Sequence, residues 1–130
     1  METKITEFLQ KTNTKMSIAF LKYGKHFAND TYNRNIYRVT LNRGTHSYTF
    51  QYGQSINATQ KNEMPSKSEI LQCLQLTDIY SYEDFCANFG YEEYEAASKK
   101  IYRAVLREYA GVCHIWESEE IDELIEIVQS

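Results

Sequence analysis

The sequence predicts an α+β fold: an N-terminal helix, an antiparallel sheet of about three strands, and a cluster of about four helices packed on one face of that sheet. Apolar and polar residues alternate singly through much of residues 16–52, as they do in half-buried strands. After Pro65, the only proline, apolar residues recur with helical spacing. The length of 130 residues fits one domain, divided into residues 1–56, the helix and sheet, and residues 65–130, the helical half.

The first two elements are a helix and a strand. A helix is predicted over Met1–Lys11, because its apolar residues fall on one side of a helix. Polar residues 12–14 end this helix. Met16–Tyr23 then alternates and predicts the first strand, whose apolar side is formed by Met16, Ile18 and Phe20.

Two further strands, Asn35–Leu41 and His46–Tyr52, are predicted to form a hairpin. A four-residue turn joins them, with Gly44 in the left-handed conformation that glycine adopts at low cost. The residues expected to face each other on the apolar side are Leu41 with His46, Val39 with Tyr48, and Tyr37 with Phe50. Polar residues, including Arg38, then lie on the other face of the sheet.

The polar segment Gln54–Pro65 is predicted to be a loop that leads into the helical half. The next two helices are expected to begin at the capping residues Ser66 and Ser81. Gly90 is expected to end the second of them.

The third and longest helix of this half is predicted from about Tyr94 to Tyr109 and is expected to end at Gly111. With the helix at Ile70–Leu76, it should cover the apolar side of the sheet. Ser118 is expected to cap a final helix. Its inward residues are expected to be Ile121, Leu124, Ile125 and Val128.

Charge is divided unevenly along the chain. Residues 1–76 contain 10 lysine and arginine residues against 5 aspartate and glutamate residues, whereas residues 77–130 contain 4 against 13. A basic first part of net charge +5 therefore precedes an acidic second part of net charge −9. Such a domain can present a basic surface to one partner and an acidic surface to another.

Acidic residues concentrate in the last predicted helix, which makes this helix the candidate partner-binding surface. They are Glu119, Glu120, Asp122, Glu123 and Glu126, with a second group near the start of the third helix: Glu92, Glu93 and Glu95. One interpretation is structural, a solvated helix face whose first carboxylates complement the helix dipole. The functional interpretation is an acidic surface that imitates a phosphate backbone or fills a basic groove of a partner protein.

The basic strands suggest two alternative functions. Arg38 and Arg43, with a tyrosine for stacking, are candidates for binding a nucleotide or signal molecule that the protein would sequester. The mixture of cations and aromatic residues is also typical of sheets that bind single-stranded nucleic acid. We do not expect direct nucleic-acid binding, because the predicted register buries the aromatic side chains and the pI of about 5.4 is low for this class.

The sequence contains no catalytic or metal-binding pattern. Its glycines are isolated, so it has no phosphate-binding loop, and no serine or cysteine stands in a nucleophile motif. Three cysteines, Cys73, Cys86 and Cys113, are too widely spaced to form a zinc motif. We therefore predict that the protein is not an enzyme and needs no metal and no cofactor.

Four stretches of the chain resemble a family of small proteins encoded by phages, prophages and other bacterial mobile elements. They are Phe20–Asp30, Arg43–Ile56 (RGTHSYTFQYGQSI), Ile70–Tyr91 (ILQCLQLTDIYSYEDFCANFGY) and Lys100–Val112 (KIYRAVLREYAGV). This resemblance implies an inhibitor of a bacterial defence system, in particular an anti-CRISPR protein that binds an effector nuclease and blocks its nucleic-acid-binding surface. It supplies no catalytic residues.

The expected partner is therefore a bacterial defence effector, such as a CRISPR nuclease complex. The N-terminal residues contain no apolar run of the kind found in signal peptides, and the chain has no stretch of about 18 apolar residues. We expect a cytoplasmic protein of the host bacterial cell that has no membrane partner. The sequence predicts no oligomeric state.

Overall fold

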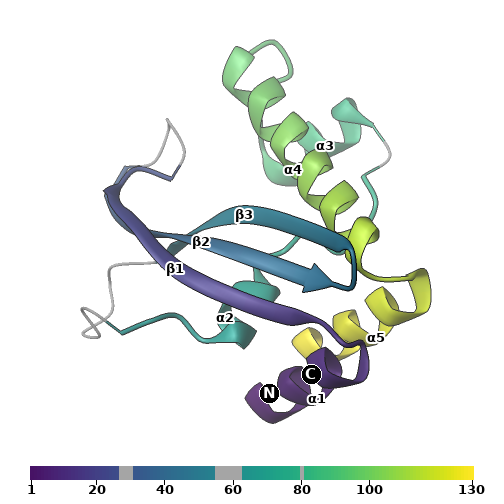
Figure 1. Cartoon of the computed structure of the whole chain (residues 1–130). Coiled ribbons are helices and arrows are strands. Elements are labelled where there is room, and N and C mark those ends of the chain that lie inside the picture. Colours follow the sequence, from purple (N-terminus) through teal and green to yellow (C-terminus); the bar gives the residue numbers. More distant parts are fainter. Residues whose placement is uncertain (27–30, 55–62, 80) are drawn as a thin grey trace.

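The computed structural model describes residues 1–26, 31–54, 63–79 and 81–130, and it confirms the predicted α+β fold (Figure 1). In chain order the elements are α1 (Glu2–Lys11), β1 (Lys15–Gly24), β2 (Arg34–Arg43), β3 (His46–Gln54), α2 (Lys67–Gln72), α3 (Tyr82–Phe89), α4 (Ala96–Ile115) and α5 (Ser118–Gln129). Most of the predicted loop between the two halves, residues 55–62, lies outside the described residues.

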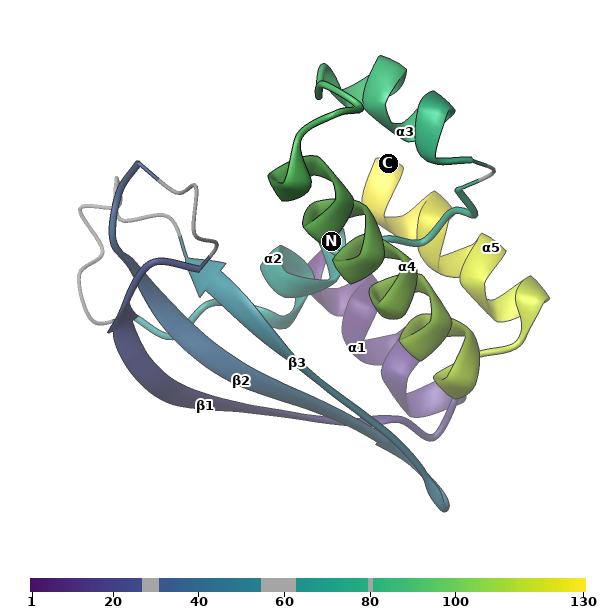
Figure 2. The ribbon, with the colours of Figure 1, turned by 90° about the horizontal axis from the view of Figure 1, so that it is seen from above.

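The three strands form one antiparallel sheet in the order β1-β2-β3, and the helices gather on one side of it (Figure 2). The helix side carries Val39 and Leu41, both fully buried. The other side is polar and exposed around Arg38 and Thr49. We call this side the open face of the sheet. At the end of the open face that is farthest from the β2–β3 turn, the His26 side chain covers Gly53.

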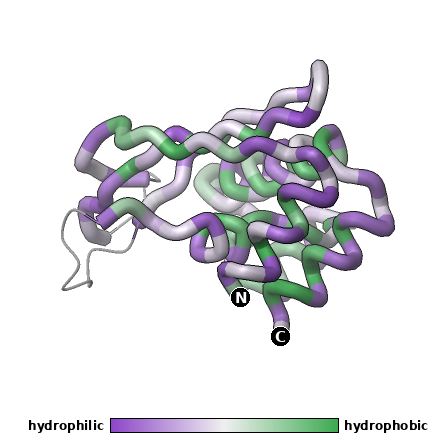
Figure 3. The backbone as a smooth tube through the Cα atoms, turned by 60° about the horizontal axis from the view of Figure 1, so that its bottom comes forward, coloured by the Kyte–Doolittle hydropathy of each residue, from purple (hydrophilic) through white to green (hydrophobic). Residues whose placement is uncertain are grey.

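The main core lies where α1, α2, α4 and α5 meet the Leu41 end of the sheet. Trp116, at the corner between α4 and α5, is 2% exposed, and its ring lies 5.4 Å from the ring of Phe8. Its indole N–H donates a hydrogen bond to Thr14 Oγ1 at 3.0 Å, which satisfies a polar group that burial would otherwise penalise. The helices next to the two termini contain both apolar and polar residues in each turn, as expected for helices that cover a core with one face (Figure 3).

The predicted hairpin register is wrong by two residues. Leu41 lies opposite Tyr48, and Val39 lies opposite Phe50. The turn contains two residues, and Gly44, the first of them, has a φ of 60°. Glycine with positive φ at this position is typical of a type II′ hairpin turn. A shift of two residues keeps every side chain on its predicted face, so the alternation of the sequence fits both registers equally.

The first strand departs from simple alternation. Its register shifts between Phe20 and Lys22, so Leu21 forms a β-bulge. Phe20 lies on the predicted apolar side, where its ring meets that of Tyr37 at 5.7 Å. It is nevertheless 57% exposed, because the helices cover only part of this side of the sheet.

Three predicted helix boundaries are also wrong. The helix predicted at Ile70–Leu76 ends at Gln72. Helix α4 continues through Gly111 to Ile115, and the cap of α5 is Glu117 in place of Ser118. A Cβ atom at position 111 would overlap the ring of Tyr48, so this glycine permits the close approach of α4 to β3. Glu117 and Glu120 form a capping box, in which each side chain accepts a hydrogen bond from the other residue's backbone N–H.

The contact between α4 and β3 predicts the effect of Gly111→Ala. Alanine favours a helix interior by about 1 kcal/mol over glycine, but the overlap with Tyr48 should reverse this gain and destabilise the protein by about 1–3 kcal/mol. Denaturant unfolding measures the change. In a Tyr48→Ala background the overlap is gone, and the same substitution should stabilise the protein. A stabilising effect in the wild-type background would contradict the close approach.

Candidate functional site

Helix α5 is held in the structure by its apolar stripe. Ile121 and Leu124 are buried, at 6% and 0% exposed, while Ile125 and Val128 are partly buried against the core. The predicted inward side of this helix is therefore confirmed. The five acidic residues of the candidate surface lie at other positions around the helix, and the structure divides them into two groups.

Glu120 belongs to the group that is engaged within the molecule. The guanidinium of Arg43 donates hydrogen bonds to both of its carboxylate oxygens, at 2.6 and 2.9 Å, and also to the backbone carbonyl of Ile115 at 3.0 Å. This bidentate contact lowers the pKa of Glu120 and raises the pKa of Arg43. It joins the tip of the β2–β3 hairpin to the corner between α4 and α5.

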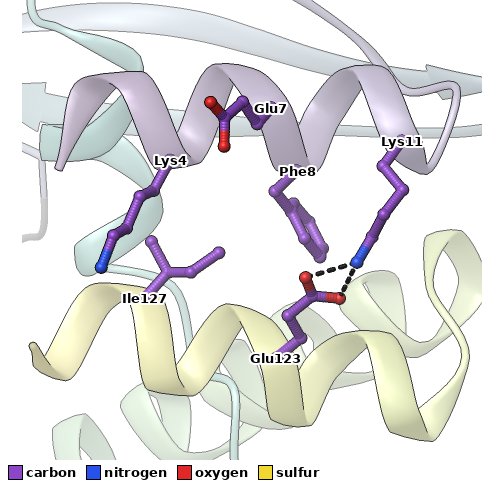
Figure 4. Close-up of a pocket in the computed structure, with 6 residues that line it drawn as sticks. All are labelled: Lys4, Glu7, Phe8, Lys11, Glu123 and Ile127. Carbon is purple, nitrogen blue, oxygen red and sulfur yellow. Dashed lines mark hydrogen bonds and ion pairs between the residues drawn. The ribbon is translucent and has the colours of Figure 1, made fainter.

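Glu123 is also paired with a cation, in this case one of the first helix. Lys11 of α1 forms an ion pair with the Glu123 carboxylate beside the ring of Phe8 (Figure 4). These residues line a groove of about 300 Å³ between α1 and α5, and Glu7, which also lines it, lies along α1 without reaching Glu123 (Figure 4). Glu123 therefore connects the first and last helices of the described fold.

Three acidic residues of α5 remain free of such pairing. Glu119, Asp122 and Glu126 are exposed, and within the described ranges none of them forms an ion pair. Their spacing of three and four residues places them on one side of the helix. We call these three residues the acidic ridge. Its direction is outward, away from the buried Ile121 and Leu124.

Other elements add to the negative charge near the acidic ridge. Tyr109 of α4 has a raised pKa because of its contact with Cys113, its partial burial, and the nearby carboxylates of Asp78 and Asp122. Asp78 belongs to the connection between α2 and α3, which has no acidic run to mark it in the sequence. Only the fold brings Asp78 and Asp122 near the same tyrosine, so the sequence pattern does not reveal Asp78.

The second predicted acidic group does not join the acidic ridge. Glu92, Glu93 and Glu95 are exposed and precede α4, whereas α5 follows the other end of α4. The 20 residues of α4 extend for about 30 Å, so the two groups lie at opposite ends of a long helix (Figure 1). They are two separate surfaces.

The two arginines proposed for nucleotide binding lie on opposite faces of the sheet. Arg43 is on the helix side and is engaged with Glu120. Arg38 lies on the open face, beside Ala19 of β1 and Gln51 of β3. The two residues are five positions apart along the strand, and this odd spacing places their side chains on opposite sides. The pair therefore does not form one binding site.

Three further observations concern metal binding, the cysteines and membrane-spanning helices. Within the part of the chain that the structure describes, no three histidine, cysteine, aspartate or glutamate side chains lie close enough together to hold a metal ion. Cys86 is buried, whereas Cys73 and Cys113 are exposed, and all three are free thiols. No helix in the described ranges is long and apolar enough to cross a lipid bilayer.

Comparisons of this chain with protein-family models, with curated proteins and with solved structures find no match. Membership of a family of phage or mobile-element proteins therefore stays a prediction from the sequence stretches described above.

The contact between Arg43 and Glu120 predicts a pH-dependent contribution to stability. Because the pKa of Glu120 is lowered in the folded state, the contact stabilises the protein above the ordinary pKa of glutamate, and this contribution is lost as the pH falls from that value through the lowered pKa. We expect Arg43→Met to lower the free energy of unfolding by about 1–2 kcal/mol at pH 7 and by less near pH 3.

Arg38→Met is the matched control, because it removes the same charge from the same strand but breaks no ion pair of the described residues. It should change the free energy of unfolding by no more than about 0.5 kcal/mol at either pH. Equal effects of the two substitutions in urea unfolding at pH 7 would contradict the role of Arg43.

Proposed function

We propose that this protein is a phage-derived inhibitor of a bacterial defence system, and that it binds an effector nuclease such as a CRISPR complex. The acidic ridge occupies a basic surface of the effector that otherwise holds guide RNA or target DNA. The protein acts by binding and not by catalysis. The observation that carries this proposal is the set of three exposed carboxylates on α5 that have no internal counterion in the described chain.

The dimensions of the acidic ridge suit a phosphate mimic. Glu119 and Glu126 are seven residues apart, which is a rise of about 10 Å along the helix. One strand of DNA carries about three phosphates over the same length. A basic groove that accepts a nucleic-acid backbone can therefore place its lysine and arginine residues against all three carboxylates. Complementary charge also accelerates association with such a groove.

Anchoring of α5 supports the same proposal. Lys11 and Arg43 engage Glu123 and Glu120 from two other elements, and the apolar stripe of the helix is buried. The acidic ridge is thus displayed on a helix that needs little further ordering when a partner binds. Pre-organisation of this kind lowers the entropic cost of association.

The alternative functions receive less support from the geometry. Sequestration of a nucleotide by Arg38 and Arg43 lacks a common site, since they lie on opposite faces. Binding of single-stranded nucleic acid would require exposed aromatic rings beside the cations. Phe20 and Tyr23 are exposed, contrary to the expectation that the register buries the aromatic residues, but they lie on the helix side, away from Arg38.

The proposal predicts that reversing the charge of the acidic ridge abolishes inhibition. The variant Glu119→Lys, Asp122→Lys, Glu126→Lys should no longer prevent a guide-loaded effector from binding its target DNA in a gel-shift assay. The effector is first identified by affinity capture from host lysate, with and without expression of a CRISPR system. A thermal unfolding curve checks that the variant remains folded, because Glu119 also favours the start of the helix.

The matched control reverses Glu92, Glu93 and Glu95, which changes the net charge by the same amount at the other end of α4. This control should retain most of the inhibition. Equal loss of inhibition in both variants would mean that total charge matters and the acidic ridge does not. Full inhibition by the acidic-ridge variant would remove α5 from the mechanism.

A further inference from the structure

Strand β1 forms one edge of the sheet, and no other strand of the described chain pairs with its outer side. Within the described ranges, its backbone makes no backbone hydrogen bond outside the ladder with β2. No helix or strand runs along most of this edge in Figures 1 and 2, and only the end of α1 lies beside its first residues, Lys15 and Met16. An edge strand of 10 residues presents a row of free N–H and C=O groups, which can pair with another extended chain.

The two sides of β1 differ in chemistry. On the open face it carries Lys15, Ser17 and Ala19 and, after the bulge, Lys22. On the helix side it carries Met16, Ile18 and Phe20 and, after the bulge, Tyr23. The last two aromatic side chains are 57% and 59% exposed, although their side of the strand is apolar. The edge therefore has a basic side and an exposed apolar side.

Among the residues that the structure describes, no acidic residue pairs with the basic side. Neither β1 nor β2 contains an aspartate or a glutamate. Lys15, Lys22 and Arg38 share the open face and form no ion pair among the described residues. This contrasts with Lys11 and Arg43, which are both engaged by acidic residues of α5. The open face next to the free edge thus has a net positive charge that no acidic residue of the described ranges neutralises.

We propose that β1 is a docking edge for an extended segment of a partner protein in which acidic residues alternate with apolar residues. The segment adds a fourth strand to the sheet through main-chain hydrogen bonds. Because side chains alternate along a strand, its acidic residues lie on the open face beside Lys15 and Lys22, and its apolar residues lie beside Ile18 and Phe20.

Charge argues against a second copy of this chain as the occupant. Pairing of β1 with β1 would bring the lysines of both copies onto one continuous face, together with two copies of Arg38, and no acid of either strand would separate them. The bulge at Leu21 and the two lysines are also features that protect edge strands from self-association. An acidic segment at this edge would face the lysines with opposite charge, so the repulsion expected for a second copy does not arise.

This docking edge is independent of the proposed function of α5. The acidic ridge would bind a basic surface, whereas the edge of β1 would bind an acidic segment. The two surfaces differ in sign, in element and in the half of the chain that forms them. If binding at one surface is not found, binding at the other surface can still be tested.

The test uses the full chain, labelled with ¹⁵N, and blocked nine-residue peptides as probes. One peptide alternates glutamate with valine, and the comparison peptide alternates lysine with valine. We expect amide shifts along residues 15–23 with the glutamate peptide and about tenfold weaker binding of the lysine peptide. The variant Lys15→Glu, Lys22→Glu should reverse this preference. Lys99→Glu, Lys100→Glu, which makes the same charge change on α4, should retain it.

Proline substitutions test the backbone pairing itself. Neighbouring N–H groups of an edge strand point alternately toward the sheet and away from it, so one of Ile18→Pro and Ala19→Pro leaves the ladder with β2 intact. The variant that keeps the wild-type melting temperature should lose peptide binding. If neither variant folds, the charge-reversal pair decides the outcome.

Three results would overturn the proposal. The first is equal binding of the two peptides, or no amide shift at millimolar concentration. The second is a set of shifts confined to other elements, such as the groove between α1 and α5. The third is concentration-dependent dimerisation of the unliganded chain that broadens the β1 amides, which would identify a second copy as the occupant.

Discussion

The packing of Trp116 against Phe8, with its indole N–H bonded to Thr14, fixes the relation between the two ends of the fold. Trp116 stands between α4 and α5, so its position sets the direction in which α5 leaves the core. Thr14 stands between α1 and β1, and its hydroxyl also meets that of Thr12 at 2.8 Å. One buried indole therefore orients the last helix and the start of the edge strand together, and both candidate binding surfaces depend on it.

Internal ion pairs give the acidic helix two roles. Glu120 and Glu123 contact cations of the hairpin tip and of α1, whereas Glu119, Asp122 and Glu126 face solvent. The uneven distribution of charge along the sequence is thus used partly within the molecule, because two cations of the basic part neutralise two carboxylates of the acidic part. What remains is a smaller acidic surface on α5 and a smaller basic surface on the open face of the sheet. Each of these two surfaces contains fewer residues than the charge count of its half of the chain suggests.

Local patterns in the sequence predict most of the fold, because strands, helix caps and buried faces depend on neighbouring residues. Ser66 and Ser81 cap their helices as expected, and Gly90 ends α3 with a φ of 74°. The misplaced features depend on distant residues. Gly111 is a contact point with Tyr48 in place of a helix end, and the hairpin register has two solutions with identical faces. Glu120 and Arg43 are 77 residues apart, so no local pattern could reveal their pairing or the reduction of the candidate acidic surface to three residues.

The contact between the first and last helices also constrains how the chain becomes ordered during synthesis. Helix α1 leaves the ribosome before α5, but its buried side chains Ile5, Phe8 and Leu9 lie in a core that includes Ile121 and Leu124 of α5. Those partners are translated more than a hundred residues later. The core therefore closes only after residues 118–129 have emerged, and until then the N-terminal helix has apolar surface available to chaperones.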